Sequence, residues 1–173
     1  MIYLLIFLRL LHVFAGVFWV GAALLWTGFL EPASRGAGEA GAKFMRYFVG
    51  QTRVTTIMAL AAIITSGSGL WLYWIVSNGL SVGWITSGPG LGFTIGTLAS
   101  GLAFGWNLAV QRRTGPQMAT IASRIQAANG PPDPQLLAEL SDLQSQVRRV
   151  GLISAVLLSI AAIAMGVARY LVF

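Results

Sequence analysis

The sequence predicts an all-α integral membrane protein, a four-transmembrane-helix bundle with a cytoplasmic helical hairpin between spans three and four. The chain of 173 residues is 56% hydrophobic and only 9% charged, and its mean hydropathy is +0.75. A soluble domain carries far more charge, about a quarter of its residues. Four apolar runs reach the ~20 residues that a helix needs to cross a bilayer, and the total length suits one domain.

The expected spans cover residues 2–30, 54–76, 91–110 and 150–173. The first is too long for the apolar region of a signal peptide, so it is interpreted as an uncleaved span. Loop 77–90 carries no charge, whereas the other two loops carry nine basic residues, which are Arg35, Lys43, Arg46, Arg53, Arg112, Arg113, Arg124, Arg148 and Arg149. Basic loops stay in the cytoplasm. This pattern predicts a multi-pass protein of the inner (cytoplasmic) membrane with both termini outside.

The net charge of +6 invites a nucleic-acid hypothesis, but the basic residues cluster between apolar runs as membrane topology requires. We therefore expect the lipid bilayer as partner and no nucleic acid. Small residues recur at helical spacing in spans three and four, where they let helix backbones approach closely. They predict a tight bundle and leave a homodimer or a partner membrane subunit open. These residues are Gly92, Gly96, Gly101 and Gly105, then Gly151, Ala155, Ser159, Ala162 and Gly166.

The third loop predicts a hairpin over about 114–149. Thr114, Gly115 and Pro116 are expected to break span three, "NGPPDP" to form the turn, and Asp133 to cap a second arm that begins at Pro134. Apolar residues along both arms predict a short coiled-coil stripe that satisfies itself or docks a partner. They are Met118, Ile121, Ile125 and Ala128, then Leu136, Leu140, Leu143, Val147 and Val150.

The first loop, "GEAGAKFMRYFVGQTR", mixes aromatic and basic residues. This mixture is typical of a short helix that lies at the surface of an anionic leaflet. We therefore expect an interfacial helix between the first two spans.

Ionisable side chains inside spans are costly and are functional candidates by default. Arg9 and His12, the only histidine, share one face of span one, and Met165 and Arg169 share one face of span four. With the N-terminus outside, His12 lies ~15 Å and Met165 ~12 Å below the outer helix ends. Imidazole and thioether are axial ligands of haem iron, and arginines suit its propionates. The layout predicts a haem b site with His12 as the metal ligand.

Plainer interpretations compete with this site. The arginines can snorkel to headgroups, His12 can serve as a neutral helix contact, and Met165 can fill space. The chain has no cysteine, which excludes thiolate metal sites and iron–sulfur clusters. A lone histidine without an in-span carboxylate forms no catalytic triad, so the catalytic residues stay unknown.

The stretch "RLLHVFAGVFWVGAALLWTGFLEPASR" resembles the first span of the copper resistance D family and of the related haem-dependent membrane protoporphyrinogen oxidases. "RVTTIMALAAIITSGSGLWLY" resembles the second span of that family. The similarity covers roughly the first 75 residues. The residues that carry it are His12, Trp19, Gly21, Pro32 and Arg35 in the first stretch, then Arg53 and Gly67 or Gly69 in the second.

This resemblance implies a four-helix membrane module in which His12 ligates haem, or copper in the copper-handling branch. Three functions stay open at the sequence level. The first is a haem-binding membrane protein with an electron-transfer or oxidoreductase-like role. The second is copper transport or resistance, and the third is a cofactor-free accessory membrane subunit.

Overall fold

A computed structural model describes residues 2–128 and 133–172, and these are almost entirely helical. Four of the helical stretches are long and apolar enough to cross a membrane, which confirms a multi-pass all-α protein. The elements in chain order are α1 Ile2–Leu25, the π-helix η1 Trp26–Leu30, α2 Glu31–Gly36, α3 Gly38–Gln51, α4 Val54–Val76, α5 Val82–Ile85, α6 Gly88–Ala127, α7 Pro134–Val167 and the 3₁₀-helix η2 Ala168–Tyr170.

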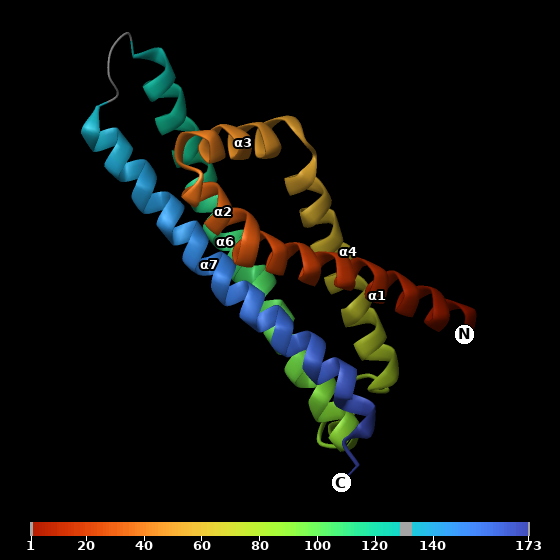
Figure 1. Cartoon of the computed structure of the whole chain (residues 1–173). Coiled ribbons are helices and arrows are strands. Elements are labelled where there is room, and N and C mark those ends of the chain that lie inside the picture. The colour runs from red at the N-terminus through yellow and green to blue at the C-terminus, as the bar shows by residue number, and fades with distance from the viewer. Residues whose placement is uncertain (1, 129–132, 173) are drawn as a thin grey trace.

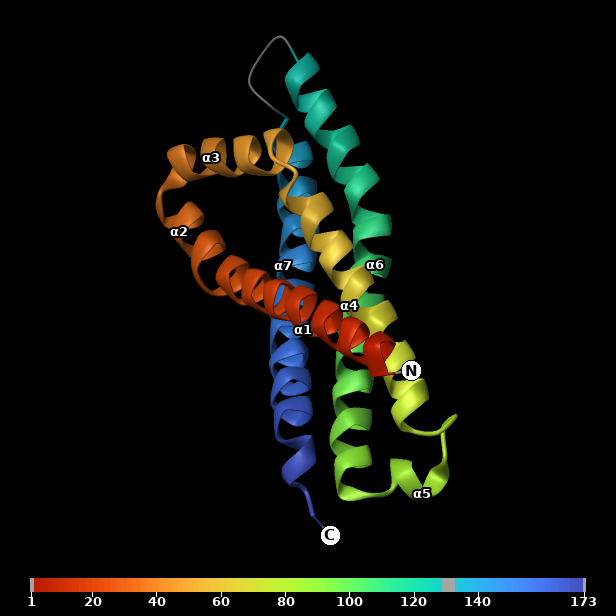
Figure 2. The same cartoon turned by 90° about the vertical axis from the view of Figure 1, so that its right-hand side faces the viewer.

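The long helices pack as two pairs. Helix α1 lies on α4 and α6 lies on α7, whereas contacts between the pairs are sparse. Helix α1 runs obliquely across the others (Figures 1 and 2). Helices α2 and α3 lie toward the end from which α6 and α7 project furthest, and α5 and the C-terminus lie at the opposite end (Figure 2). Every basic segment between spans therefore gathers toward one end of the molecule.

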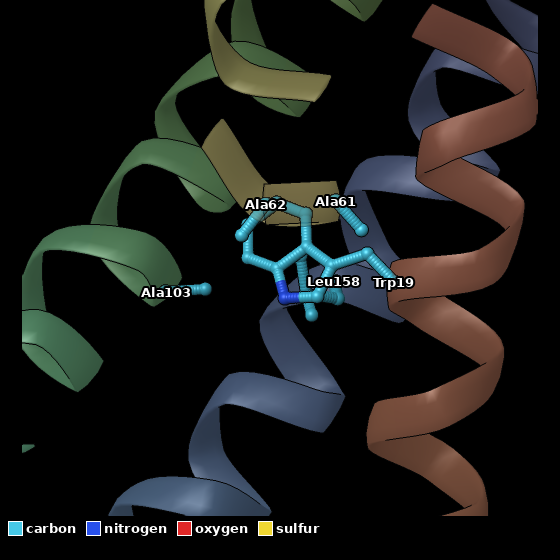
Figure 3. Packing of buried hydrophobic residues seen from close by; sticks show 5 residues of the cluster. All are labelled: Trp19, Ala61, Ala62, Ala103 and Leu158. Carbon is cyan, nitrogen blue, oxygen red and sulfur yellow. The ribbon is translucent and has the colours of Figure 1, made fainter. Parts of the chain in front are cut away.

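The two pairs meet at a small buried cluster around Trp19 of α1. Its partners come from the three other long helices and are Ala61 and Ala62 of α4, Ala103 of α6 and Leu158 of α7 (Figure 3). The indole also meets the ring of Phe104 edge-on, with centroids 6.2 Å apart. Because its partners are mostly alanines, one large ring fills the space where four backbones come close.

The break that we expected at residues 114–116 is wrong, because α6 continues through Pro116 to Ala127. Thr114 is 1% exposed, and its hydroxyl donates to the Val110 carbonyl over 2.9 Å. Proline removes one backbone hydrogen bond and crowds the previous turn. Packing against the neighbouring helix α7 makes such a position tolerable within a long helix.

The second arm begins as expected, because the Asp133 carboxylate accepts the Gln135 amide over 2.8 Å and Pro134 stands in the first turn of α7. The expected turn at 129–132 lies outside the described residues. On the facing arms, Ile121 and Leu143 are buried. The other stripe residues between 118 and 147 are half-buried except Ala128, which is exposed; they are Met118, Ile125, Leu136, Leu140 and Val147. The stripe therefore turns inward between the arms.

The first loop is helical, and α3 confirms the short helix expected there. The chain continues from α1 through a π-turn, where the Glu31 amide donates to the Trp26 carbonyl five residues earlier. A short link at Ala37 and Gly38, which has a φ of +59°, then turns the chain into α3. Glycine adopts this left-handed backbone without the steric cost that a side chain would add.

The four glycines of the small-residue stripe in span three have two different environments. A β-carbon on Gly92 would stand 2.7 Å from Ala168 Cβ of η2, and one on Gly96 would stand 2.5 Å from Met165 Cγ of α7, so both would clash. Gly101 and Gly105 have open space around them. The half of the stripe nearer the start of α6 therefore packs on α7 and η2, whereas the other half has open space around it.

Candidate functional site

His12 lies at the contact between α1 and α4. Its Nδ1 atom is 2.9 Å from the backbone carbonyl oxygen of Thr65. A carbonyl oxygen can only accept, so Nδ1 carries the proton of this hydrogen bond. In the neutral ring, Nε2 then holds the free lone pair. The contact joins two spans that are neighbours in sequence, and it fixes the orientation of the imidazole.

Gly69 makes room for this ring. A β-carbon built on Gly69 would stand 2.6 Å from Cε1 and 2.9 Å from Nδ1 of His12. Real β-carbons do not come so close to other heavy atoms. Gly67, two residues earlier, has nothing within 4 Å of the same built atom. The imidazole therefore rests on the one glycine of α4 that faces α1 at this depth.

Thr65 supports the same contact from within α4. Its side chain is 7% exposed, and its hydroxyl donates to the Ala61 carbonyl over 2.7 Å. That bond turns the hydroxyl back along its own helix and away from the imidazole. His12 therefore recognises the backbone of α4 rather than a side chain, and the hydrogen bond would survive many substitutions of Thr65.

The other predicted site residues have neighbours of their own. Met165 packs on Gly96 of α6, and Arg169 donates to the Tyr170 hydroxyl, with its guanidinium carbon 4.6 Å from the centroid of that ring. Arg9 is exposed one turn before His12. Helices α1 and α7 diverge away from the Trp19 cluster (Figures 1 and 2). The grouping of Met165 and Arg169 with His12 therefore stays a prediction.

The chemistry available at this site is that of one oriented imidazole. Nδ1 is occupied by a backbone carbonyl, as in most metal-binding histidines, where such a bond fixes the tautomer and leaves the other nitrogen to the metal. Within residues 2–128 and 133–172, no three His, Asp or Glu side chains gather in a way that could hold a metal ion.

Sequence reasoning missed Thr65 and Gly69 as the partners of His12. A signal was present, because "TSGSG" at 65–69 is the most polar and least bulky stretch of span two. Thr65 and Gly69 are four residues apart and so share one helix face. Hydropathy alone could not show that this face turns toward α1.

Comparisons with protein-family models, with curated proteins and with solved structures find no match for this chain. The family resemblance drawn from the first two spans therefore stays a prediction.

Proposed function

We propose that this membrane protein binds haem through His12 and has an electron-transfer or oxidoreductase-like role. The observation that carries the proposal is the hydrogen bond from Nδ1 of His12 to the Thr65 carbonyl. This bond orients the ring so that Nε2 is available as a ligand. Because Gly69 has no side chain, the imidazole fits against α4. A histidine that served only to fill space would not need a fixed tautomer.

The residues present fit one side of the cofactor. His12 would hold the haem iron, and Arg9, one turn nearer the N-terminus, would be the cation available to a propionate. Met165 and Arg169 contact α6 and Tyr170, so the proposal does not depend on them. Haem held in this way supplies one-electron chemistry, whose potential depends on the axial ligand and its hydrogen bonds.

The proposed setting is the inner membrane, with both termini outside and the α6–α7 arms in the cytoplasm as a helical hairpin. It is supported by the nine basic residues in the first and third loops against none in 77–90. The described helices bring these basic segments toward one end (Figures 1 and 2). A homodimer or partner subunit would cover the open glycines Gly101 and Gly105.

The test is the absorption spectrum of the purified protein after expression with haem supply. We expect a Soret band that His12→Ala abolishes and Arg9→Ala weakens. Met165→Leu is the matched control, because it changes the other candidate ligand while leaving the α1–α4 contact intact. A Soret band that His12→Ala leaves unchanged would refute the assignment of the ligand.

A second candidate is a cofactor-free accessory subunit, and the same hydrogen bond favours it because it ties α1 to α4 without any ligand. In that case the protein shows no Soret band, and His12→Ala lowers its stability only. Copper by elemental analysis without a Soret band would instead support copper transport or resistance, the other hypothesis from the sequence.

A further inference from the structure

An apolar pocket of about 330 Å³ lies on the α3 side of the Trp19 cluster, and His12 does not line it. Its walls come from α1, the π-turn η1, α3 and the start of α4. Its volume is at the lower end of the range for ligand-binding pockets. The residues that the argument needs are Gly21, Trp26, Phe48, Val54 and Met58.

The pocket owes its shape to two local features. Trp26 and Leu30, the first and last residues of the π-turn, both line it. Opposite them, Phe48 of α3 lies 6.0 Å from Trp26 between ring centroids and stacks on Phe44 at 5.6 Å. Leu30 also lines a second apolar pocket, of about 290 Å³, between α2 and α3. The π-turn and α3 thus form a continuous apolar lining.

Every residue that lines the larger pocket is apolar, so its occupant must be apolar too. Charge lies just outside. Arg53 is exposed and directly precedes Val54, a lining residue. The segment 31–53 carries four basic residues, Arg35, Lys43, Arg46 and Arg53, against two acidic ones, Glu31 and Glu39. An occupant with a hydrocarbon chain and a negative head matches both parts.

We propose that this pocket holds one acyl chain of an anionic phospholipid, with its headgroup at Arg53. Such a chain would contact α1, η1, Phe48 of α3 and the start of α4, which are the walls of the pocket. Phospholipid rather than a soluble metabolite is the occupant, since all of its walls are helices of a membrane protein and none is polar. This site is separate from His12 and does not depend on haem binding.

The experiment measures lipid retention by native mass spectrometry of the full chain in detergent. The probes are phosphatidylglycerol and phosphatidylcholine with identical chains, one negative and one neutral. Gly21→Leu should fill the pocket, because no atom lies within 4 Å of a β-carbon at this lining position. Gly101→Leu on α6 is its control, since it is equally open and lines neither pocket.

The wild type should retain phosphatidylglycerol over phosphatidylcholine, and Gly21→Leu should lose the bound lipid while Gly101→Leu keeps it. Arg53→Gln should lower the preference for the anionic lipid about fivefold, the effect of one basic residue near a membrane surface. Arg124→Gln, a change in the exposed last turn of α6, should leave it unchanged. Equal retention of both lipids by the wild type, or retention unaffected by Gly21→Leu, would overturn the proposal.

Discussion

His12 and Gly69 form one structural unit, because the imidazole occupies the space that a side chain at position 69 would need. The unit has a donor, Nδ1, an acceptor, the Thr65 carbonyl, and a glycine that sets their separation. A backbone acceptor inside a helix cannot rotate away. The orientation of the ring is therefore determined by the relative position of two helix backbones.

Gly69→Ala should displace the imidazole, since the added β-carbon would stand 2.6 Å from Cε1. On the proposed function, haem affinity should fall about tenfold or more, as it does when the support of a metal-binding histidine is removed. The measurement is haem titration followed at the Soret band. Gly67→Ala is the matched control, because it adds the same atom on the same helix into open space.

If Gly69→Ala binds haem as tightly as Gly67→Ala does, haem binding does not require the contact of the His12 ring with α4, and the proposed ligand geometry is wrong.

The sequence singled out His12 because an ionisable group in an apolar run is rare for a physical reason, the cost of its burial in lipid. The helix that it faces could not be predicted in the same way. Depth follows from counting residues along a helix, but rotation and neighbours depend on which small residues face one another. The prediction grouped His12 with Met165 because their depths matched. The neighbours that depth could not show are Gly69 beside His12 and Gly96 beside Met165.

Helices α6 and α7 extend well past the length that a bilayer requires, with 40 and 34 residues against the ~20 of a span. Their projecting arms carry an apolar stripe that lies between them. Asn107 and Ser154 add a polar link between the same two helices, with the amide donating over 2.9 Å. The α6–α7 pair is thus held along most of its length.

Leu143→Ala should destabilise the paired arms by about 2–5 kcal/mol, since a buried leucine loses both its transfer energy and its packing. Leu143 is 8% exposed, whereas Leu137 on the same arm is 46% exposed. Leu137→Ala is therefore the control and should have little effect. Limited proteolysis of the arms and thermal unfolding in detergent measure the difference.

Equal protection of the two variants would mean that the stripe does not hold the arms together.

The stripe could be predicted because its residues alternate in steps of three and four, the spacing of facing helices. The continuity of α6 through Pro116 could not. Proline next to glycine usually ends a helix, and the sequence around residue 115 offers both. What outweighs this preference is tertiary, namely the buried Thr114 and the neighbouring α7.

At the scale of the whole molecule, the number of spans and their helical nature follow directly from hydropathy. The division into two pairs does not, because lipid-facing and protein-facing residues are equally apolar in a membrane. The meeting point of the four helices at Trp19, among alanines from α4 and α6, was found only in the structure. The side of the membrane on which each end lies depends on charge and is open to a direct test.

Labelling with an impermeant thiol reagent in intact cells should reach a cysteine at Ser81 and not one at Ser123. The chain has no cysteine of its own, so each variant reports one position. Both serines are exposed, Ser81 beside α5 and Ser123 on the projecting arm of α6. The reason is the basic charge around Ser123 and its absence from 77–90.

Labelling of Ser123→Cys in intact cells would reverse the orientation and would place Arg9 on the inner side of His12.

The pairwise packing also has a consequence for how the protein is made. Each pair joins spans that are consecutive in the chain, α1 with α4 and α6 with α7. Chains are synthesised from the N-terminus and pack in that order. The bond between His12 and Thr65 can therefore form while the ribosome is still translating α6. The α6–α7 pair and the Trp19 cluster, which includes Leu158 of α7, must wait for the last span, so they belong to the final step of assembly in the membrane.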